Sequence, residues 1–181
     1  MQTIRIAFSG AACTGKTTLM KAMDPSYKYF ASMARDLASR GIKINEKGTI
    51  ESQNVLLEQH LINLDCEEAE VQVYDRCLLD WFVFTQDLYN HKGMSTEDFK
   101  RFEQYFLKNI DRYDIICYID PEFKLQEDGV RNINPYYYNN IVDLFHKTIY
   151  NYSVPVERIS GTVEERLEKV KCLLKSHMSR H

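Results

Sequence analysis

The feature that most constrains the fold is a glycine-rich stretch near the start of the chain. Its sequence, Gly10-Ala11-Ala12-Cys13-Thr14-Gly15-Lys16-Thr17, fits the pattern G-x-x-x-x-G-K-[ST] at every fixed position. An apolar run at residues 4–8 precedes it, and a helical stretch at residues 17–23 follows it. Because the pattern stands between a predicted strand and a predicted helix, it predicts a loop that holds the phosphates of a nucleoside triphosphate.

Each fixed position of this pattern has a chemical role. Glycines at 10 and 15 let the backbone turn and come close to an anion. We expect Lys16 on the β- and γ-phosphates, and the Thr17 hydroxyl as a ligand that helps hold Mg²⁺. The residues predicted to bind the nucleotide are Gly10, Ala11, Ala12, Cys13, Thr14, Gly15, Lys16, Thr17 and Thr18.

The rest of the chain alternates strands with helices. Strands are predicted at residues 4–8, 27–30, 71–74, 115–119 and 156–160. Helices are predicted at residues 17–23, 31–39 and 50–70, and from Ser95, from Asn134-Pro135 and from Thr162. This alternation indicates an α/β fold with a parallel sheet and right-handed crossovers. The length of 181 residues suits one domain, so residues 1–181 are predicted to form a single unit.

In the helix at 50–70, Val55, Leu56 and Ile62 are expected on the apolar face.

Two acidic residues follow predicted central strands, at the edge of the sheet where ligands bind. Asp75 is a candidate metal ligand, or a base that accepts a proton from a substrate hydroxyl. Arg76 could clamp a phosphate through two hydrogen bonds, and Asp80 could face the same cleft. The alternative is that Asp75 caps the next helix and Arg76 is a surface cation. Asp120 ranks second for metal binding, since no arginine adjoins it.

A polar segment at residues 121–135 lies between a predicted strand and a predicted helix. It carries Lys124, Gly129 and Arg131. Phosphoryl transfer needs cations over the transferred group and exclusion of water, so we interpret the segment as a lid that bears Arg131. The alternative is an exposed loop with an incidental arginine.

Composition restricts the partners and the compartment. The formal net charge of −3 argues against a nucleic-acid partner. The cysteines are odd in number and form no C-x-x-C pair, which favours free thiols in a reducing compartment. No signal-peptide pattern and no membrane-spanning apolar run occur in the sequence. We therefore expect a soluble cytoplasmic protein with no membrane partner.

Four motifs together resemble P-loop kinases of the nucleoside and nucleotide kinase type. They are GAACTGKTT, ARDL at residues 34–37, YDRCLLD and EDGVR. The pattern is nearest to the nicotinamide riboside kinase-like ATPase families. The stretch YDRCLLDWFVF is also similar to the D/E-R-S segment of deoxynucleoside kinases and the D-R-x segment of thymidylate kinases.

This resemblance implies a P-loop NTPase fold, with a five-stranded parallel sheet flanked by helices. It implies ATP with Mg²⁺ as the phosphoryl donor and a small acceptor bound across the sheet from the loop. It places Asp75 and Arg76 at the acceptor or the metal, and Arg131 in the lid.

The chain departs from these families at one position. They often carry an acidic residue at the end of the second strand, where this sequence has Ser32. Either Asp36 or Asp75 could then serve as the base. Arg35, Gln53 and Gln59 are candidate acceptor contacts or ordinary structural residues. Trp81 and Phe84 could stack on a base or belong to the core.

The favoured function is an ATP-dependent kinase for a nucleoside or a nucleoside monophosphate. Its predicted catalytic residues are Lys16, Asp75, Arg76 and Arg131, and its predicted metal ligands are Thr17 and Asp75. The alternatives are a regulatory nucleotide-binding ATPase and a kinase that acts on nucleic acid. The sequence lacks the N/T-K-x-D segment that a GTPase uses to read guanine. It leaves the acceptor unnamed and a homodimer open.

Overall fold

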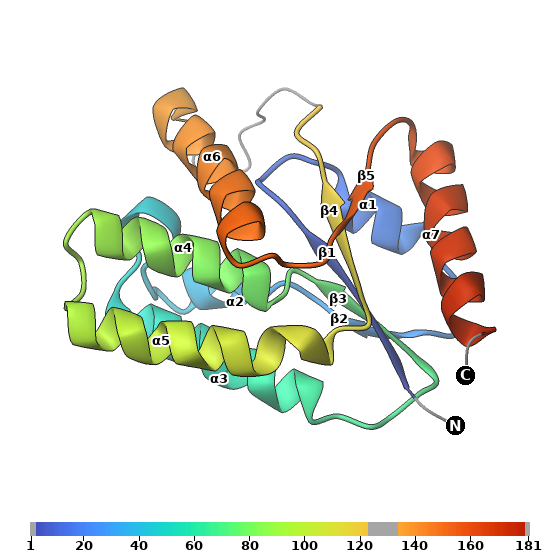
Figure 1. Ribbon diagram of the computed structural model, residues 1–181, viewed down its shortest axis with the longest axis horizontal. Coiled ribbons are helices and arrows are strands. Elements are labelled where there is room, and N and C mark those ends of the chain that lie inside the picture. The colour runs from blue at the N-terminus through green and yellow to red at the C-terminus, as the bar shows by residue number, and fades with distance from the viewer. Residues whose placement is uncertain (1–2, 123–133, 180–181) are drawn as a thin grey trace.

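The computed structural model describes residues 3–122 and 134–179, apart from the side chain of Arg35. The strands are β1 Ile4–Ser9, β2 Lys28–Phe30, β3 Val71–Asp75, β4 Ile115–Ile119 and β5 Glu157–Ile159. The helices are α1 Lys16–Lys21, α2 Ala34–Ser39, α3 Ile50–Leu64, α4 Leu78–Asn90, α5 Thr96–Asn109, α6 Pro135–Asn151 and α7 Val163–Met178. Two 3₁₀ turns, η1 Asn45–Lys47 and η2 Ile110–Arg112, complete the elements (Figure 1).

Strand β1 lies at the centre of a five-stranded sheet with the order β2-β3-β1-β4-β5. Every neighbouring pair is parallel, and Ile6 is in register with Val73 of β3 and with Ile115 of β4. The predicted parallel sheet flanked by helices is confirmed. The chain moves away from β1 in both directions, and in such sheets ligands bind beyond the carboxyl ends of the strands at this switch point.

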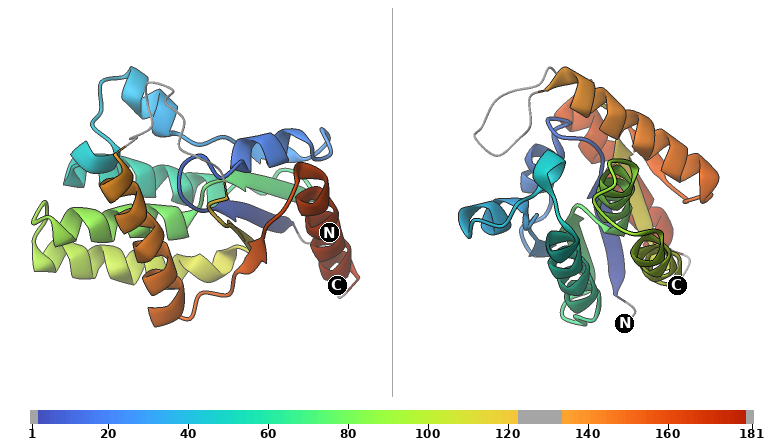
Figure 2. Two further views of the ribbon diagram at one scale, coloured as in Figure 1. Left: turned by 90° about the horizontal axis from the view of Figure 1, so that it is seen from above. Right: turned by 90° about the vertical axis from the view of Figure 1, so that its left-hand side faces the viewer.

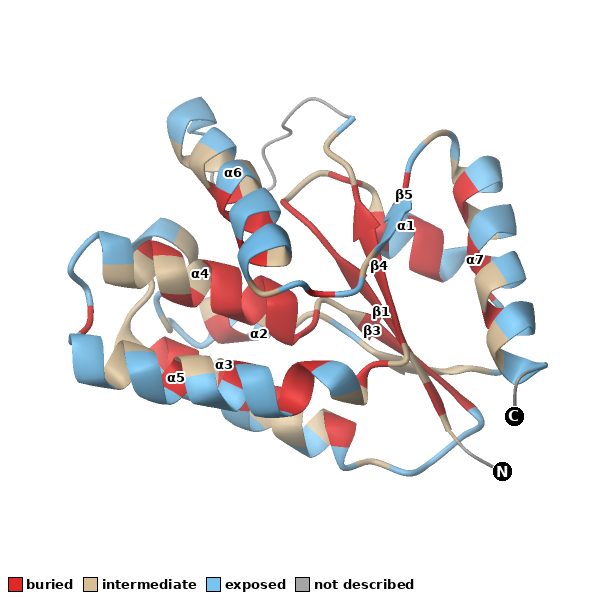
Figure 3. Cartoon of the chain, in the orientation of Figure 1, coloured by how far each residue is buried: buried red, intermediate tan, exposed pale blue. Residues whose placement is uncertain are grey.

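Helices cover both faces of the sheet (Figure 1 and Figure 2). Ile6 and Phe8 of β1 pack with apolar residues of α1 and α7, whereas Ala7 packs in the cluster built from α3, α4, α5 and α6. The central strands β1, β3 and β4 and the inner faces of these helices are mostly buried, and the outer helix faces are exposed (Figure 3). A sheet covered on both faces explains why β4 reads as an almost continuous apolar run.

The predicted helix starts are confirmed where a capping residue marks them. Ser95 accepts a hydrogen bond from the Asp98 N–H at the start of α5. Thr162 and Glu165 form a capping box at the start of α7. Asn134 caps α6, with a proline at its first position. A side chain that pairs with the free N–H groups of a first turn is a local signal and can be read from sequence.

The prediction for the third helix was wrong at its end and on its apolar face. The helix ends at Leu64 instead of reaching residue 70. The Gln72 side chain donates to the carbonyls of Cys66 and Glu68, so it holds the following segment as a loop. Ile62, expected on the buried face, is 55% exposed. The buried face instead carries polar residues, namely Ser52, Gln53 and His60, beside Leu57 and Leu64.

Two further boundaries differ from the prediction. Helix α2 begins at Ala34 rather than at residue 31, because residues 31–33 form the turn that follows β2. The structure also contains a helix that is not among the predicted elements, α4, which lies between β3 and α5. Among the helices of the described residues, none combines the length and apolarity needed to cross a membrane.

Candidate functional site

The loop between β1 and α1 depends on two glycines with left-handed backbone angles. Gly10 has a φ of 136°, and a Cβ atom there would lie 2.7 Å from the Ile119 carbonyl oxygen. Gly15 has a φ of 87° and stands at the N-terminal cap of α1. A side chain at position 10 would collide with backbone that cannot move aside, so the loop can pass β4 this closely only with glycine there.

Lys16 is folded into the curve of its own loop. Its side chain is 6% exposed, and its ammonium donates to the Gly10 carbonyl at 2.8 Å, to the Ala11 carbonyl and to the Thr14 hydroxyl at 3.0 Å. The positive charge therefore lies beside the backbone that the motif predicts to hold phosphates. That role stays a prediction, but the position of Lys16 suits it.

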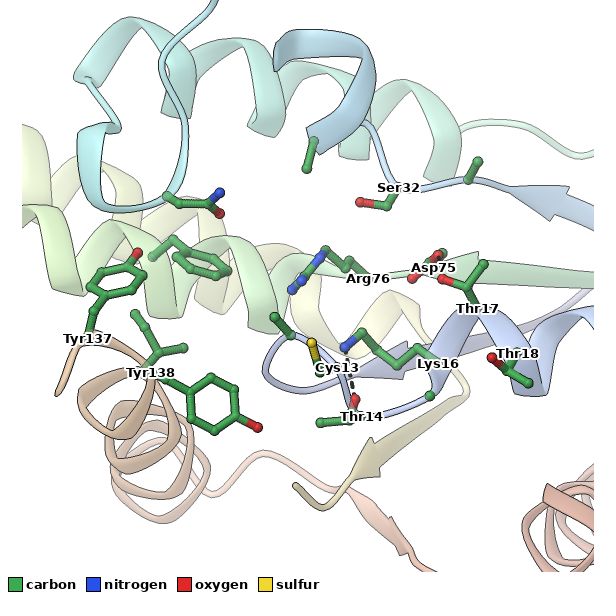
Figure 4. Close-up of a pocket in the computed structure, with 17 residues that line it drawn as sticks. Cys13, Thr14, Lys16, Thr17, Thr18, Ser32, Asp75, Arg76, Tyr137 and Tyr138 are labelled. Carbon is green, nitrogen blue, oxygen red and sulfur yellow. Dashed lines mark hydrogen bonds between the residues drawn. The ribbon is translucent and has the colours of Figure 1, made fainter. Parts of the chain in front are cut away.

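Thr17 and Asp75 face each other across the edge of the sheet. The Thr17 hydroxyl donates to the Asp75 carboxylate at 2.8 Å (Figure 4). Asp75 does not cap α4, because Cys77 and Asp80 form the capping box of that helix, so the alternative role as a helix cap is wrong. One hydroxyl and one carboxylate are a donor set that fits Mg²⁺, which prefers oxygen and usually completes its shell with waters and substrate phosphates. Within the described residues, no group of three or more His, Cys, Asp or Glu could hold a metal.

Arg76 is held inside the site rather than on the surface. Its backbone has a φ of 77°, which is strained for a residue with a side chain. Its guanidinium donates to Asp80 at 2.8 Å and lies 5.6 Å from the centre of the Phe84 ring. The alternative of a surface cation is therefore wrong. Arg76 directly follows the last residue of β3 and precedes the cap of α4.

Asp80 links the loop to α4. Its carboxylate is 1% exposed and accepts hydrogen bonds from the Gly10 N–H, the Cys77 N–H and Arg76. A buried carboxylate is stable only when it is paired in this way. The prediction that Asp80 faces the same cleft as Asp75 agrees with the second cavity, which both residues line, and Asp80 also supports the loop and Arg76 through these hydrogen bonds.

These residues surround a cavity of about 260 Å³. Its wall consists of residues 12–18, Ala31, Ser32, Ala34, Asn45, Asp75, Arg76, Phe84, Tyr137, Tyr138 and Ile141. The two tyrosines stand at the start of α6, across the cavity from the loop (Figure 4). Their hydroxyls are buried and have no hydrogen-bond partner in the part of the chain that the structure describes.

A second cavity of about 60 Å³ adjoins the first and shares part of its wall. The shared residues are Ala31, Ser32, Ala34, Asn45, Asp75, Arg76 and Phe84. Aromatic residues line much of the remainder, and Phe30 stacks on Tyr74 with ring centres 4.7 Å apart. The backbone carbonyl of Gln53 accepts from the Trp81 indole, and its side-chain oxygen accepts from Thr85.

His60 is the least expected member of the second cavity. Burial lowers the pKa of its imidazole to about 4, so the ring is neutral at pH 7. A neutral imidazole offers one donor and one acceptor, so it could pair with the polar edge of a ligand.

Several candidate residues lie elsewhere. Asp120 pairs with Arg158 at 2.8 Å and lines neither cavity. Asp36 forms an exposed pair with Arg40, and Gln59 bonds to Asn63.

Ser32, in contrast, lines both cavities, as its place in the sequence suggested. Lys124, Gly129 and Arg131 lie outside the described residues, as does the side chain of Arg35.

Sequence reasoning missed several residues around the cavities, namely Asn45, His60, Tyr137 and Tyr138. The tyrosines follow the predicted cap at Asn134, but a helix start does not reveal which of its side chains face a ligand. His60 was hidden because a polar residue on a helix usually faces solvent. Neither signal identifies a site without the tertiary structure.

The chain matches one protein family model and has a fold similar to that of several solved structures. A family model described as an AAA domain matches residues 5–166. The solved structure of deoxyadenosine kinase from M. mycoides with bound dATP superposes with a TM-score of 0.70 at 16% identity, covering 95% of this chain and 99% of that one. The same kinase with dCMP and dCDP as products gives 0.69 at 17% identity, covering 96% and 99%. No curated protein matches the sequence.

A third similar structure is the NadR protein in complex with NAD and AMP-PNP. It superposes with a TM-score of 0.64 at 19% identity, covering 88% of this chain but 45% of that one. At such identities the likeness establishes a shared fold, the P-loop NTPase fold.

Proposed function

The chain belongs to the AAA domain family, and from this premise we propose that it is an ATP-dependent phosphotransferase with a nucleoside or nucleoside monophosphate as acceptor. One observation carries the proposal: Asp75 and Arg76 belong to the walls of both cavities. The first cavity contains the phosphate loop and the second lies on the other side of these two residues. Donor and acceptor would therefore meet at Asp75 and Arg76.

In this proposal the first cavity binds ATP. The loop N–H groups and Lys16 hold the β- and γ-phosphates, and residues 10–18 form the binding segment. Thr17 and Asp75 would hold Mg²⁺, which when bound neutralises charge on the phosphate oxygens. Two of the similar structures contain a bound nucleotide, dATP in the one and AMP-PNP in the other, which supports a nucleotide donor here.

In the second cavity, Asp75 is the proposed base for the acceptor hydroxyl. It is the carboxylate common to both cavities, whereas Asp36 and Asp120 are paired at other places. A base within reach of the hydroxyl supplies a path for its proton. Beyond the shared Asp75 and Arg76, the second cavity adds a carboxylate, Asp80, and no lysine or arginine among the described residues, so we favour a nucleoside over a nucleoside monophosphate.

Arg76 and Arg131 are the proposed cations at the transferred group. Arg76 is fixed by Asp80 and would need little reorganisation to contact a phosphate. Arg131 belongs to the proposed lid at residues 121–135. Together the proposed roles describe one kinase domain over residues 1–181, and its cytoplasmic location and homodimeric state stay predictions from sequence.

The alternatives differ in what they need beside the loop. A regulatory ATPase needs no acceptor cavity, and a kinase for nucleic acid needs an open basic groove. The second cavity is small and lies against the buried Trp81, and the chain carries a net negative charge. Both observations favour a small-molecule acceptor.

A phosphotransfer screen tests the proposal. The protein would be incubated with labelled ATP and Mg²⁺ against nucleosides, nucleoside monophosphates, nicotinamide riboside and a short DNA, with Lys16→Ala as the inactive reference. We expect transfer to at least one nucleoside. ATP hydrolysis that no acceptor stimulates would favour the regulatory ATPase, and transfer confined to DNA would favour the nucleic-acid kinase.

A further inference from the structure

Arg166 of α7 is a buried arginine that contacts the phosphate loop from behind. Its side chain is 2% exposed. One terminal nitrogen donates to the Thr14 carbonyl at 2.6 Å, Nε donates to the Gly161 carbonyl at 2.8 Å, and the other terminal nitrogen donates to Glu122 at 2.6 Å. These bonds connect the loop, the end of the β4 segment and the turn before α7.

A guanidinium in this position is unusual for a helix residue. Arginine is almost never fully buried unless it is paired, because removing its charge from water costs several kcal/mol. Here one carboxylate and two carbonyl groups compensate for that loss. Arg158, at the same end of the sheet, shows the ordinary arrangement: its side chain is 53% exposed and it pairs with Asp120 on the surface.

The hydrogen bond to Thr14 determines more than the position of one carbonyl group. The Thr14–Gly15 peptide is trans and planar, so its carbonyl and its N–H point in opposite directions. Arg166 holds the carbonyl on the side of α7. The N–H of Gly15 must then face the other way, and Gly15 lines the cavity that contains Lys16 and Thr17.

We propose that Arg166 is a positioning residue, which orients the Thr14–Gly15 peptide so that the Gly15 N–H donates to a phosphate oxygen of the bound nucleotide. Without this hydrogen bond the peptide could rotate and turn its carbonyl oxygen toward the phosphates. An oxygen there would repel the nucleotide where a donor should attract it. The inference rests on the proposed function, because it requires a nucleotide phosphate in the first cavity.

The test compares nucleotide affinity among three variants by calorimetric titration with Mg·ADP, at a temperature where each variant is folded. Arg166→Met removes the donors, and we expect the Kd to rise about tenfold to a hundredfold, as for loss of a hydrogen bond to a charged group. Arg166→Lys keeps the charge without the planar fork and should fall between. The matched control is Arg158→Met, which removes an exposed arginine and should change the Kd less than about twofold.

A second arm separates positioning from simple stabilisation. Glu122→Gln weakens the contact between Arg166 and Glu122 but leaves the hydrogen bond to Thr14. We expect a lower melting temperature with a Kd for Mg·ADP close to that of the unmodified protein. In turnover, Arg166→Lys should raise the KM for ATP and leave the KM for the acceptor unchanged. A fall in melting temperature with no change in either nucleotide constant would overturn the proposal.

A measurement on the unmodified protein covers the case in which the Arg166 variants do not fold. In ¹⁵N spectra we expect a slowly exchanging Arg166 Nε–H, and a large shift of the Gly15 amide when ADP is added. A fast-exchanging Nε–H or an unmoved Gly15 amide would refute the inference alone. If the unmodified protein does not bind ADP or ATP at all, the proposed function fails instead.

Discussion

The two cavities are built in different ways, although they share a wall. One wall of the first is a run of consecutive residues, 12–18, whose path is set by glycines and by the end of β1. The second is made of side chains from β2, α3, β3 and α4, which are far apart in the sequence. A site made of consecutive backbone leaves a motif in the sequence, whereas a site made of dispersed side chains does not.

The cavities also differ in charge. Lys16 and Arg76 lie at the first, together with Asp75. The second shares Asp75 and Arg76 and adds the carboxylate of Asp80 and the neutral His60, but among the described residues it adds no lysine or arginine. The first cavity therefore carries the ammonium of Lys16 that would suit a polyanion, whereas the second adds a carboxylate instead of a cation. Changes on the two sides should therefore have different effects.

The largest expected effect is that of Lys16→Ala. It removes the ammonium predicted to neutralise the phosphates, so kcat should fall about a thousandfold or more. Circular dichroism should show a folded protein. Lys21→Ala, at the exposed end of the same helix, is the matched control and should keep normal turnover. Normal turnover in the Lys16 variant would show that the ammonium of Lys16 is not needed in the first cavity.

Asp75→Asn tests the shared wall. The amide keeps the shape and can still accept from Thr17, but it can neither take a proton nor bind Mg²⁺ as a carboxylate does. We expect kcat to fall about a hundredfold or more. Asp120→Asn is the control, since Asp120 pairs with Arg158 and lines neither cavity. A loss below about threefold would exclude Asp75 as base or metal ligand.

Gly10→Ala tests whether the backbone alone shapes the first cavity. The new Cβ would meet the Ile119 carbonyl at 2.7 Å at a φ of 136°, so we expect a loss of about 2–4 kcal/mol in the free energy of unfolding. Gly41→Ala has a left-handed φ but no atom within 4 Å, so its loss should be about 1 kcal/mol. Urea unfolding measures both. Equal losses would show that strain, and not the close approach, makes glycine necessary at position 10.

The smallest expected effect is that of His60, and it tests whether the second cavity contains a buried neutral imidazole. The pKa is about 4 in the folded protein and near 6.5 when unfolded, so the unfolded chain binds the proton first. Stability should fall as the pH drops from 6.5 toward 4, by about 1 kcal/mol at pH 5.5. His60→Gln should remove this part of the pH dependence in urea unfolding. An unchanged pH profile would mean that His60 is not buried as a neutral ring.

Features that depend on neighbouring residues could be predicted from the sequence, whereas features that depend on packing between distant segments could not. The phosphate loop, the alternation of strands and helices, and the cap residues Ser95, Asn134 and Thr162 are local signals, and the structure confirms the elements that they predict. Asp75 could be assigned to the sheet edge because it ends a strand. His60 and Tyr137 could not be assigned, because their burial depends on packing between helices that no local pattern records. Ile62 was misplaced for the same reason.

The contact between Arg166 and Thr14 joins positions 152 residues apart. In a nascent chain the glycine-rich loop is synthesised long before its partner in α7. The loop would therefore stay incompletely organised on the ribosome until α7 docks. Nucleotide binding by growing chains of increasing length would then report completion of the whole domain rather than of its first β-α unit.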